Sequence, residues 1–136
     1  MKQVEFYFDL GSPYSYLGFW QIQKIAEQHA AEIIWKPILL GGVFKATGNN
    51  SPMAVPAKAH YSMIDLGRWS KLWDIPVQMN PYFPINTLNL MRLITAVHMY
   101  QPEQFLPVLT ALFNAMFRNP RNLNDANELI QLGHEL

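Results

Sequence analysis

The first forty residues contain the pattern that most restricts how this chain can fold. Val4 to Asp9 (VEFYFD) is a short aromatic and β-branched run, which is typical of a buried strand. From Tyr14 to about His29 apolar residues recur at helical spacing, and Glu32 to Leu40 (EIIWKPILL) predicts a second strand. A strand, a helix and a strand in this order predict a β-α-β unit, the usual opening of an α/β domain.

The remainder of the chain is expected to be helical after one loop. Residues 41–56 are rich in Gly, Asn, Ser and Pro, which predicts a loop, and four helical segments follow, at Ala57–Trp73, about Asn86–Tyr100, Glu103–Arg118 and Asn124–Glu135. We therefore divide the chain into a β-α-β unit, 1–40, and a loop with a helical insert, 41–136. Two strands alone make a poor sheet. Either the helices carry the core, another chain supplies strands, or the natural protein continues beyond Leu136.

Composition excludes several classes of function. Half of the 136 residues are hydrophobic and only 15% are charged, which is typical of a globular protein. The formal net charge is zero, so nothing attracts a nucleic acid or an anionic membrane over long range. No apolar run approaches the ~18 residues of a membrane span, and the N-terminus has no signal-peptide pattern. We expect a cytoplasmic protein without nucleic-acid or membrane partners.

The chain has no cysteine, which rules out disulfides, cysteine-ligated metals and thiol redox chemistry on the protein itself. Its four histidines, at positions 29, 60, 98 and 134, share no metal-ligand spacing. The acidic residues form no close pair beyond helix-surface spacing, which leaves paired-carboxylate hydrolysis without support. We expect no metal site.

The strongest candidate site is the junction between the first strand and the first helix. Ser12 suits the N-cap and Pro13 the first helical turn, and by spacing alone this pair is more often just a good helix start. Unpaired N–H groups and the helix dipole also favour an anion there. A thiolate would be stabilised at such a position. Since the protein has no thiol, the thiolate would come from a ligand, with the Ser12 hydroxyl as hydrogen-bond donor.

The sequence around this junction resembles known families. Ser12-Pro13-Tyr14-Ser15 is similar to the Cys-Pro-x-Cys of thioredoxin-like redox sites, with serine at both cysteine positions. Residues 6–18 (FYFDLGSPYSYLG) resemble the opening of the 2-hydroxychromene-2-carboxylate isomerases and of the related kappa-class glutathione transferases. Three later segments resemble the same families in the same order, 39–49 (LLGGVFKATGN), 58–66 (KAHYSMIDL) and 83–92 (FPINTLNLMR). The resemblance thus covers most of the chain.

The resemblance implies a thioredoxin-like α/β fold with a large helical insert. In these families the domain is completed by a β-hairpin and a closing helix, preceded by a Val-Pro turn with a cis proline that faces the catalytic serine. The sequence ends before any of these, and Val55-Pro56 lies in the wrong place to substitute. We therefore expect a fold that is truncated before the final β-hairpin and helix, with an incomplete glutathione site.

The resemblance also implies residue roles. Ser12 matches the catalytic serine that holds the sulfur of glutathione. Asn49 and Lys58 match positions that line the glutathione site, and Asn86 lies in the segment that flanks the substrate pocket. Lys58 also suits this role chemically, because an ammonium can pair with a glutathione carboxylate. Without the resemblance, Lys58 would be a solvated helix residue and Asn49 a turn residue.

The function implied is a glutathione-dependent cis-trans isomerase, acting on an unsaturated aromatic 2-oxo acid or its cyclic hemiketal in aromatic catabolism. Glutathione would be a regenerated cofactor, and a small aromatic molecule the substrate. A kappa-like glutathione transferase is the first alternative. A non-catalytic truncated module that dimerises through its helices is the second alternative. A homodimer is compatible with all three.

Overall fold

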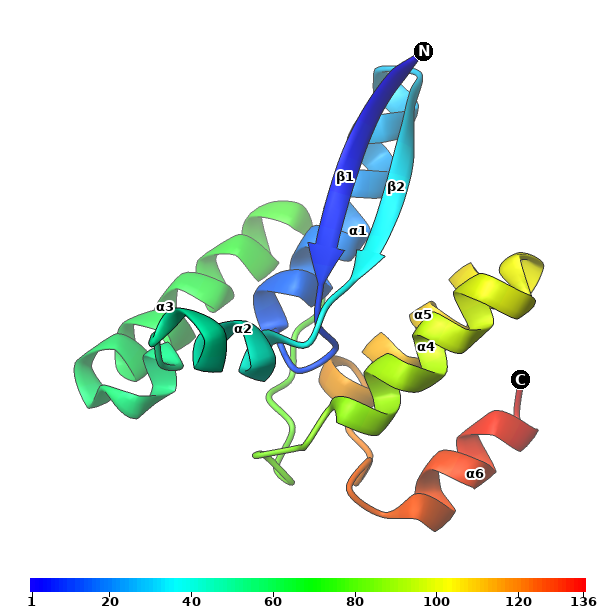
Figure 1. Ribbon diagram of the computed structural model, residues 1–136. Helices are drawn as coiled ribbons and strands as arrows, with labels where there is room; N and C mark the ends of the chain where they lie inside the picture. The colour runs from blue at the N-terminus through cyan, green and yellow to red at the C-terminus, as the bar shows by residue number, and fades with distance from the viewer.

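Two parallel strands and the helix that connects them form the N-terminal unit (Figure 1). In the computed structural model, which describes residues 1–136, β1 spans Lys2–Phe8, α1 Pro13–Gln28 and β2 Ala31–Pro37. Residue 2 pairs with residue 31, and the register continues unbroken to residues 8 and 37. The predicted β-α-β unit is confirmed. The two strands run parallel, and α1 is the crossover that parallel strands need.

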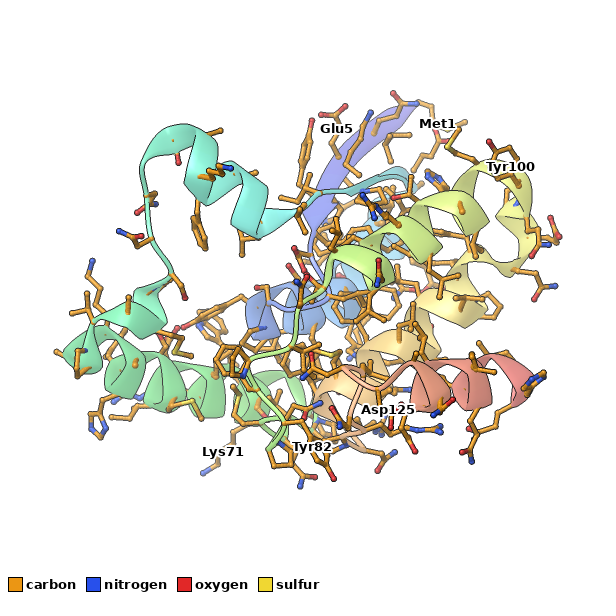
Figure 2. The ribbon with its side chains drawn as sticks, turned by 60° about the horizontal axis from the view of Figure 1, so that its bottom comes forward. Met1, Glu5, Lys71, Tyr82, Tyr100 and Asp125 are labelled. Atoms are coloured by element: carbon orange, nitrogen blue, oxygen red, sulfur yellow. The ribbon has the colours of Figure 1, made fainter.

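A helix occupies part of the segment that was expected to be a loop. α2 spans Leu40–Thr47, so β2 ends three residues earlier than predicted. The expectation of a loop over 41–56 was wrong in its first half, since the low helix propensity of Gly41 and Gly42 hides this helix. α2 ends where Gly48 adopts a left-handed conformation, with φ of 71°. Figure 2 shows α2 and the residues after it arching from the end of β2 to the start of α3.

The later helices follow the predicted segments with shifted ends. A 3₁₀ turn, η1 (Pro52–Ala54), precedes α3 (Pro56–Trp73), and a connection of irregular structure leads to α4 (Leu88–Tyr100). A second turn, η2 (Pro102–Gln104), precedes α5 (Phe105–Phe117), and α6 (Ala126–His134) ends the chain. None of these helices is both long and apolar enough to cross a membrane.

The core lies where α5 meets α1 and one face of the sheet. The side chain of Phe113 on α5 is fully buried, and its ring lies 6.0 Å from that of Phe8, 6.1 Å from Tyr16 and 5.1 Å from Phe19. α1 approaches the sheet closely at Gly18, where a Cβ atom would lie 3.0 Å from the ring of Phe6. Buried residues from both 1–40 and 41–136 join this cluster, and the division at residue 40 stays a prediction.

The opposite face of the strand pair carries mainly polar side chains, together with Ile34 and Tyr7. Gln3 donates a hydrogen bond of 2.8 Å to Glu32 across the pair, and Lys36 lies 3.6 Å from Glu5. These exposed contacts contribute little to stability. The strands are therefore held in place by the aromatic side chains on the covered face, which also fix the position of the β1–α1 junction.

Candidate functional site

Ser12 is held rigidly at the N-terminus of α1. Its backbone N–H donates to the carbonyl of Asp9 at 3.0 Å, and its Oγ accepts the N–H of Ser15 at 3.1 Å, the hydrogen bond of an N-cap. Pro13 occupies the first helical position, as expected. Because Oγ uses a lone pair for the cap, the hydroxyl hydrogen is free to be donated to a ligand.

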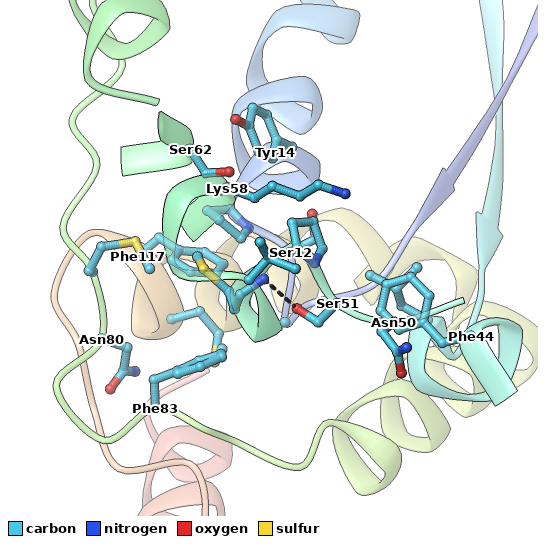
Figure 3. A pocket seen from close by; sticks show the side chains of 18 of the residues that line it. Ser12, Tyr14, Phe44, Asn50, Ser51, Lys58, Ser62, Asn80, Phe83 and Phe117 are labelled. Carbon is cyan, nitrogen blue, oxygen red and sulfur yellow. Dashed lines mark hydrogen bonds between the residues drawn. The ribbon is translucent and has the colours of Figure 1, made fainter. Parts of the chain in front are cut away.

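A cavity of about 540 Å³ opens beside Ser12 (Figure 3). It is bounded by the starts of α1 and α3, by α2 with the segment 49–53, and by the end of α5. Ser12, Asn49 and Lys58 all line it, so the structure brings together the three residues that the resemblance assigned to glutathione. These residues come from three separate segments, which only the tertiary fold places around one hollow.

The lining of this cavity is polar on some walls and apolar on others. Lys58 is its one charged side chain, and Asn50, Ser51 and Ser62 add uncharged polar groups. The apolar lining includes the aromatic and methionine side chains of Phe44, Met53, Met79, Phe83, Met116 and Phe117, together with Leu40 and Val55. A concave site with mixed walls suits a ligand that has both charged and apolar parts.

Asn86 lies outside this cavity, in an adjoining hollow of about 290 Å³. Both hollows are lined by Gly11, Leu40, Phe44, Phe83 and Met116, which form the boundary between them. The side chain of Asn86 accepts the N–H of Leu88 at 3.0 Å at the start of α4. The helix predicted to begin at about Asn86 therefore begins two residues later, with Thr87 and not Asn86 at the N-cap position of α4.

Sequence reasoning missed several residues of the lining. Tyr14 is one, and its hydroxyl donates to Asp65 on α3 at 2.8 Å. Burial raises the pKa of Tyr14 above 10.0, and the hydrogen bond to Asp65 raises it further. Phe83, which is joined to Pro84 by a cis peptide bond, is another. The contact between Tyr14 and Asp65 joins residues 51 positions apart, so no local pattern could reveal it.

The carboxylate of Asp9 is the most deeply buried polar group near the site, with 3% of the residue exposed. It accepts three hydrogen bonds of 2.8 Å, from the N–H groups of Gly11 and Leu40 and from the hydroxyl of Thr87. No group of three His, Asp or Glu side chains lies close enough to hold a metal ion. The chemistry of the site thus rests on hydroxyls, amides, one ammonium and a helix N-terminus.

Comparisons with known proteins give a consistent result. A family model described as a DSBA-like thioredoxin domain matches residues 3–136. Glutathione S-transferase kappa 1 of Caenorhabditis elegans is 42% identical over 84 residues, 61% of this chain and 37% of that protein. A 2-hydroxychromene-2-carboxylate isomerase of Pseudomonas putida is 32% identical over 116 residues, 84% of this chain and 55% of that protein.

A solved structure is also similar along almost the whole chain. It is that of a 2-hydroxychromene-2-carboxylate isomerase, with a TM-score of 0.77 and 26% identity, and the match covers 98% of this chain and 64% of that one. The chain therefore spans less than two thirds of the length of each of these relatives.

Proposed function

The chain belongs to the family of DsbA-like thioredoxin domains and has the thioredoxin-like fold, and on that premise we propose that it is a glutathione-dependent isomerase of the 2-hydroxychromene-2-carboxylate type. One observation carries the proposal. Ser12, Asn49 and Lys58 line one cavity at the N-terminus of α1. The relatives named above are enzymes, an isomerase and a glutathione transferase.

The residues around Ser12 fit the thiolate of glutathione. The Ser12 hydroxyl accepts the N–H of Ser15 and keeps its hydrogen for an acceptor in the cavity. The positive end of the α1 dipole adds to the stabilisation of a negative charge at this point. Both effects favour the ionised thiol, and no cysteine of the protein competes for the position.

We assign the carboxylate and peptide groups of glutathione to Lys58 and Asn49. Lys58 carries the one positive charge in the lining, and glutathione carries two carboxylates. The Asn49 side-chain oxygen accepts the N–H of Asn50 at 2.8 Å, which leaves its NH₂ group to donate to the peptide groups of the same ligand. This assignment leaves the aromatic and methionine side chains of the lining near Phe83 and Phe117 for an apolar substrate.

Bound glutathione would supply a nucleophilic sulfur that adds to an unsaturated aromatic 2-oxo acid and leaves again after a bond has rotated. Ser12 would hold the sulfur and stabilise its charge before addition and after departure. Asn86, in the adjoining hollow, would donate a hydrogen bond to an oxygen of the substrate as negative charge develops there. A cytoplasmic location, a role in aromatic catabolism and a homodimer stay predictions of the sequence.

A kappa-like glutathione transferase is the second candidate. It is favoured by the 42% identity to the kappa transferase of C. elegans. The same groups of the protein would activate the thiol, but the conjugate would be released as product. The two activities therefore differ in whether glutathione is regenerated.

The experiment that tests the proposal has two parts. Glutathione is first titrated into the 136-residue chain by calorimetry, and 2-hydroxychromene-2-carboxylate is then added with a small fraction of one equivalent of glutathione. Conversion of many equivalents of substrate to the equilibrium mixture, with glutathione unchanged, is the expected result. Consumption of glutathione in proportion to product would identify a transferase instead. A chain that binds no glutathione would be a non-catalytic module.

A further inference from the structure

The buried carboxylate of Asp9 connects three segments that meet beside the site. Its Oδ1 accepts the N–H of Gly11, one residue before Ser12, and its Oδ2 accepts the N–H of Leu40, the first residue of α2. Its third partner is the hydroxyl of Thr87, immediately before α4. Hydrogen bonds to an ionised carboxylate are stronger and more directional than those between neutral groups.

Each of these segments contributes to the hollows beside Ser12. The turn at Gly11 leads into α1, α2 carries Phe44, and the segment that ends at Thr87 carries Phe83. The carboxylate of Asp9 therefore links the turn before Ser12 to the segments that carry Phe44 and Phe83.

The packing around Gly11 is tight. A Cβ atom on Gly11 would lie 3.0 Å from the methyl group of Thr87 and 3.4 Å from Oδ1 of Asp9. A side chain at position 11 would therefore press against Thr87, and one of the two would have to shift. Thr87 is itself buried, with 8% of the residue exposed.

We propose that Asp9 and Thr87 are positioning residues, which hold Ser12 at the distance from α2 that the bound sulfur requires. The inference rests on the proposed function, because it assigns a role toward glutathione. Neither residue needs to touch the ligand. Each acts through the backbone of the turn that carries Ser12.

The test replaces the Thr87 hydroxyl without changing the size of the side chain. Thr87→Val removes the hydrogen bond to Asp9, and Thr87→Ser keeps it. Thr95→Val is the matched control, because the Thr95 hydroxyl donates at 2.7 Å to the carbonyl of Met91 within its own helix. Circular dichroism confirms that each variant is folded. Amide hydrogen exchange then shows whether Gly11 and Leu40 have lost protection.

The decisive readout is the pH at which bound glutathione ionises, followed by the ultraviolet absorbance of the thiolate. In Thr87→Val this midpoint should rise by at least about half a pH unit, since a misplaced hydroxyl stabilises the thiolate less. Thr87→Ser should restore the wild-type midpoint, and Thr95→Val should not move it. S-methylglutathione, which has no ionisable thiol, should bind Thr87→Val and wild type within about twofold of each other.

The outcomes separate the inference from the proposed function. If the wild-type chain binds no glutathione, the proposed function is refuted and the inference with it. If the wild type binds but Thr87→Val keeps the wild-type midpoint, the inference alone is refuted. The inference is equally refuted if S-methylglutathione binds Thr87→Val much more weakly than it binds the wild type. The substitution would then have disrupted the cavity as a whole.

Discussion

Replacing Ser12 by alanine should reduce both stability and turnover, for two separable reasons. The 3.1 Å hydrogen bond from the N–H of Ser15 to Oγ would be lost, and loss of an N-cap costs about 1 kcal/mol. For a domain of this size that corresponds to a fall in melting temperature of about 4 °C. The variant would also lack the hydroxyl that donates a hydrogen bond to the charged sulfur. Because removal of one preorganised donor from a charged reaction centre typically costs about 10²-fold or more in rate, turnover should fall by about that factor.

A second variant at the same position separates these two effects. Aspartate caps a helix as well as serine does, so Ser12→Asp should keep the wild-type melting temperature. An ionised carboxylate has no hydrogen to donate and repels a thiolate, so turnover should still be lost. We therefore expect Ser12→Ala to melt a few degrees below the wild type and Ser12→Asp to melt with it, while both variants lose most of their turnover.

Melting followed by circular dichroism and initial rates at saturating glutathione measure the two quantities. Turnover of Ser12→Ala close to that of the wild type would remove Ser12 from the mechanism. Substantial turnover in Ser12→Asp would show that hydrogen-bond donation to the sulfur is not what this position contributes. A melting temperature of Ser12→Ala equal to wild type would contradict the capping role.

Three further predictions concern charge, pH and packing. Lys58→Gln should weaken glutathione binding by about three- to tenfold and reduce its salt dependence, whereas Lys71→Gln at the far end of the same helix should change neither in calorimetry. Burial raises the pKa of Tyr16 above 10.0, so the folded state keeps this proton longer than the unfolded state and stability falls as pH rises past about 10. Tyr16→Phe should reduce this loss of stability, which is measured as the free energy of unfolding in urea between about pH 8 and 11. Gly67→Ala on open helix surface should stabilise the protein by about 0.5–1 kcal/mol, while Gly18→Ala, which meets a ring of β1, should show no gain in the same unfolding assay.

Local features of the chain were sufficient to predict the β-α-β unit and the start of α1. Strand and helix periodicity depend on neighbouring residues, and Ser12-Pro13 is a helix start by its own chemistry. The boundaries were less accurate. α2 was not predicted, because Gly41 and Gly42 are poor helix formers. In addition, the N–H of its first residue, Leu40, binds the side chain of Asp9, a residue 31 positions away.

The site residues were predicted from a different source. Asn49 and Lys58 were named because the segments around them resemble those of a family, and nothing in their own spacing pointed to a ligand. The structure places both beside Ser12 in one cavity and Asn86 in an adjoining one. Their role toward glutathione is a proposal that the experiments above test.

The sequence by itself determined the strand–helix–strand opening, the capped start of α1 and the absence of any protein thiol, since each depends only on adjacent residues or on composition. The tertiary structure alone decided that Asp9 would bind the first residue of α2 and the hydroxyl of Thr87, 78 positions away. It also decided which polar side chains share a cavity with apolar walls. Such contacts depend on how the helices pack against the sheet, and packing is a property of the whole chain that no local pattern contains.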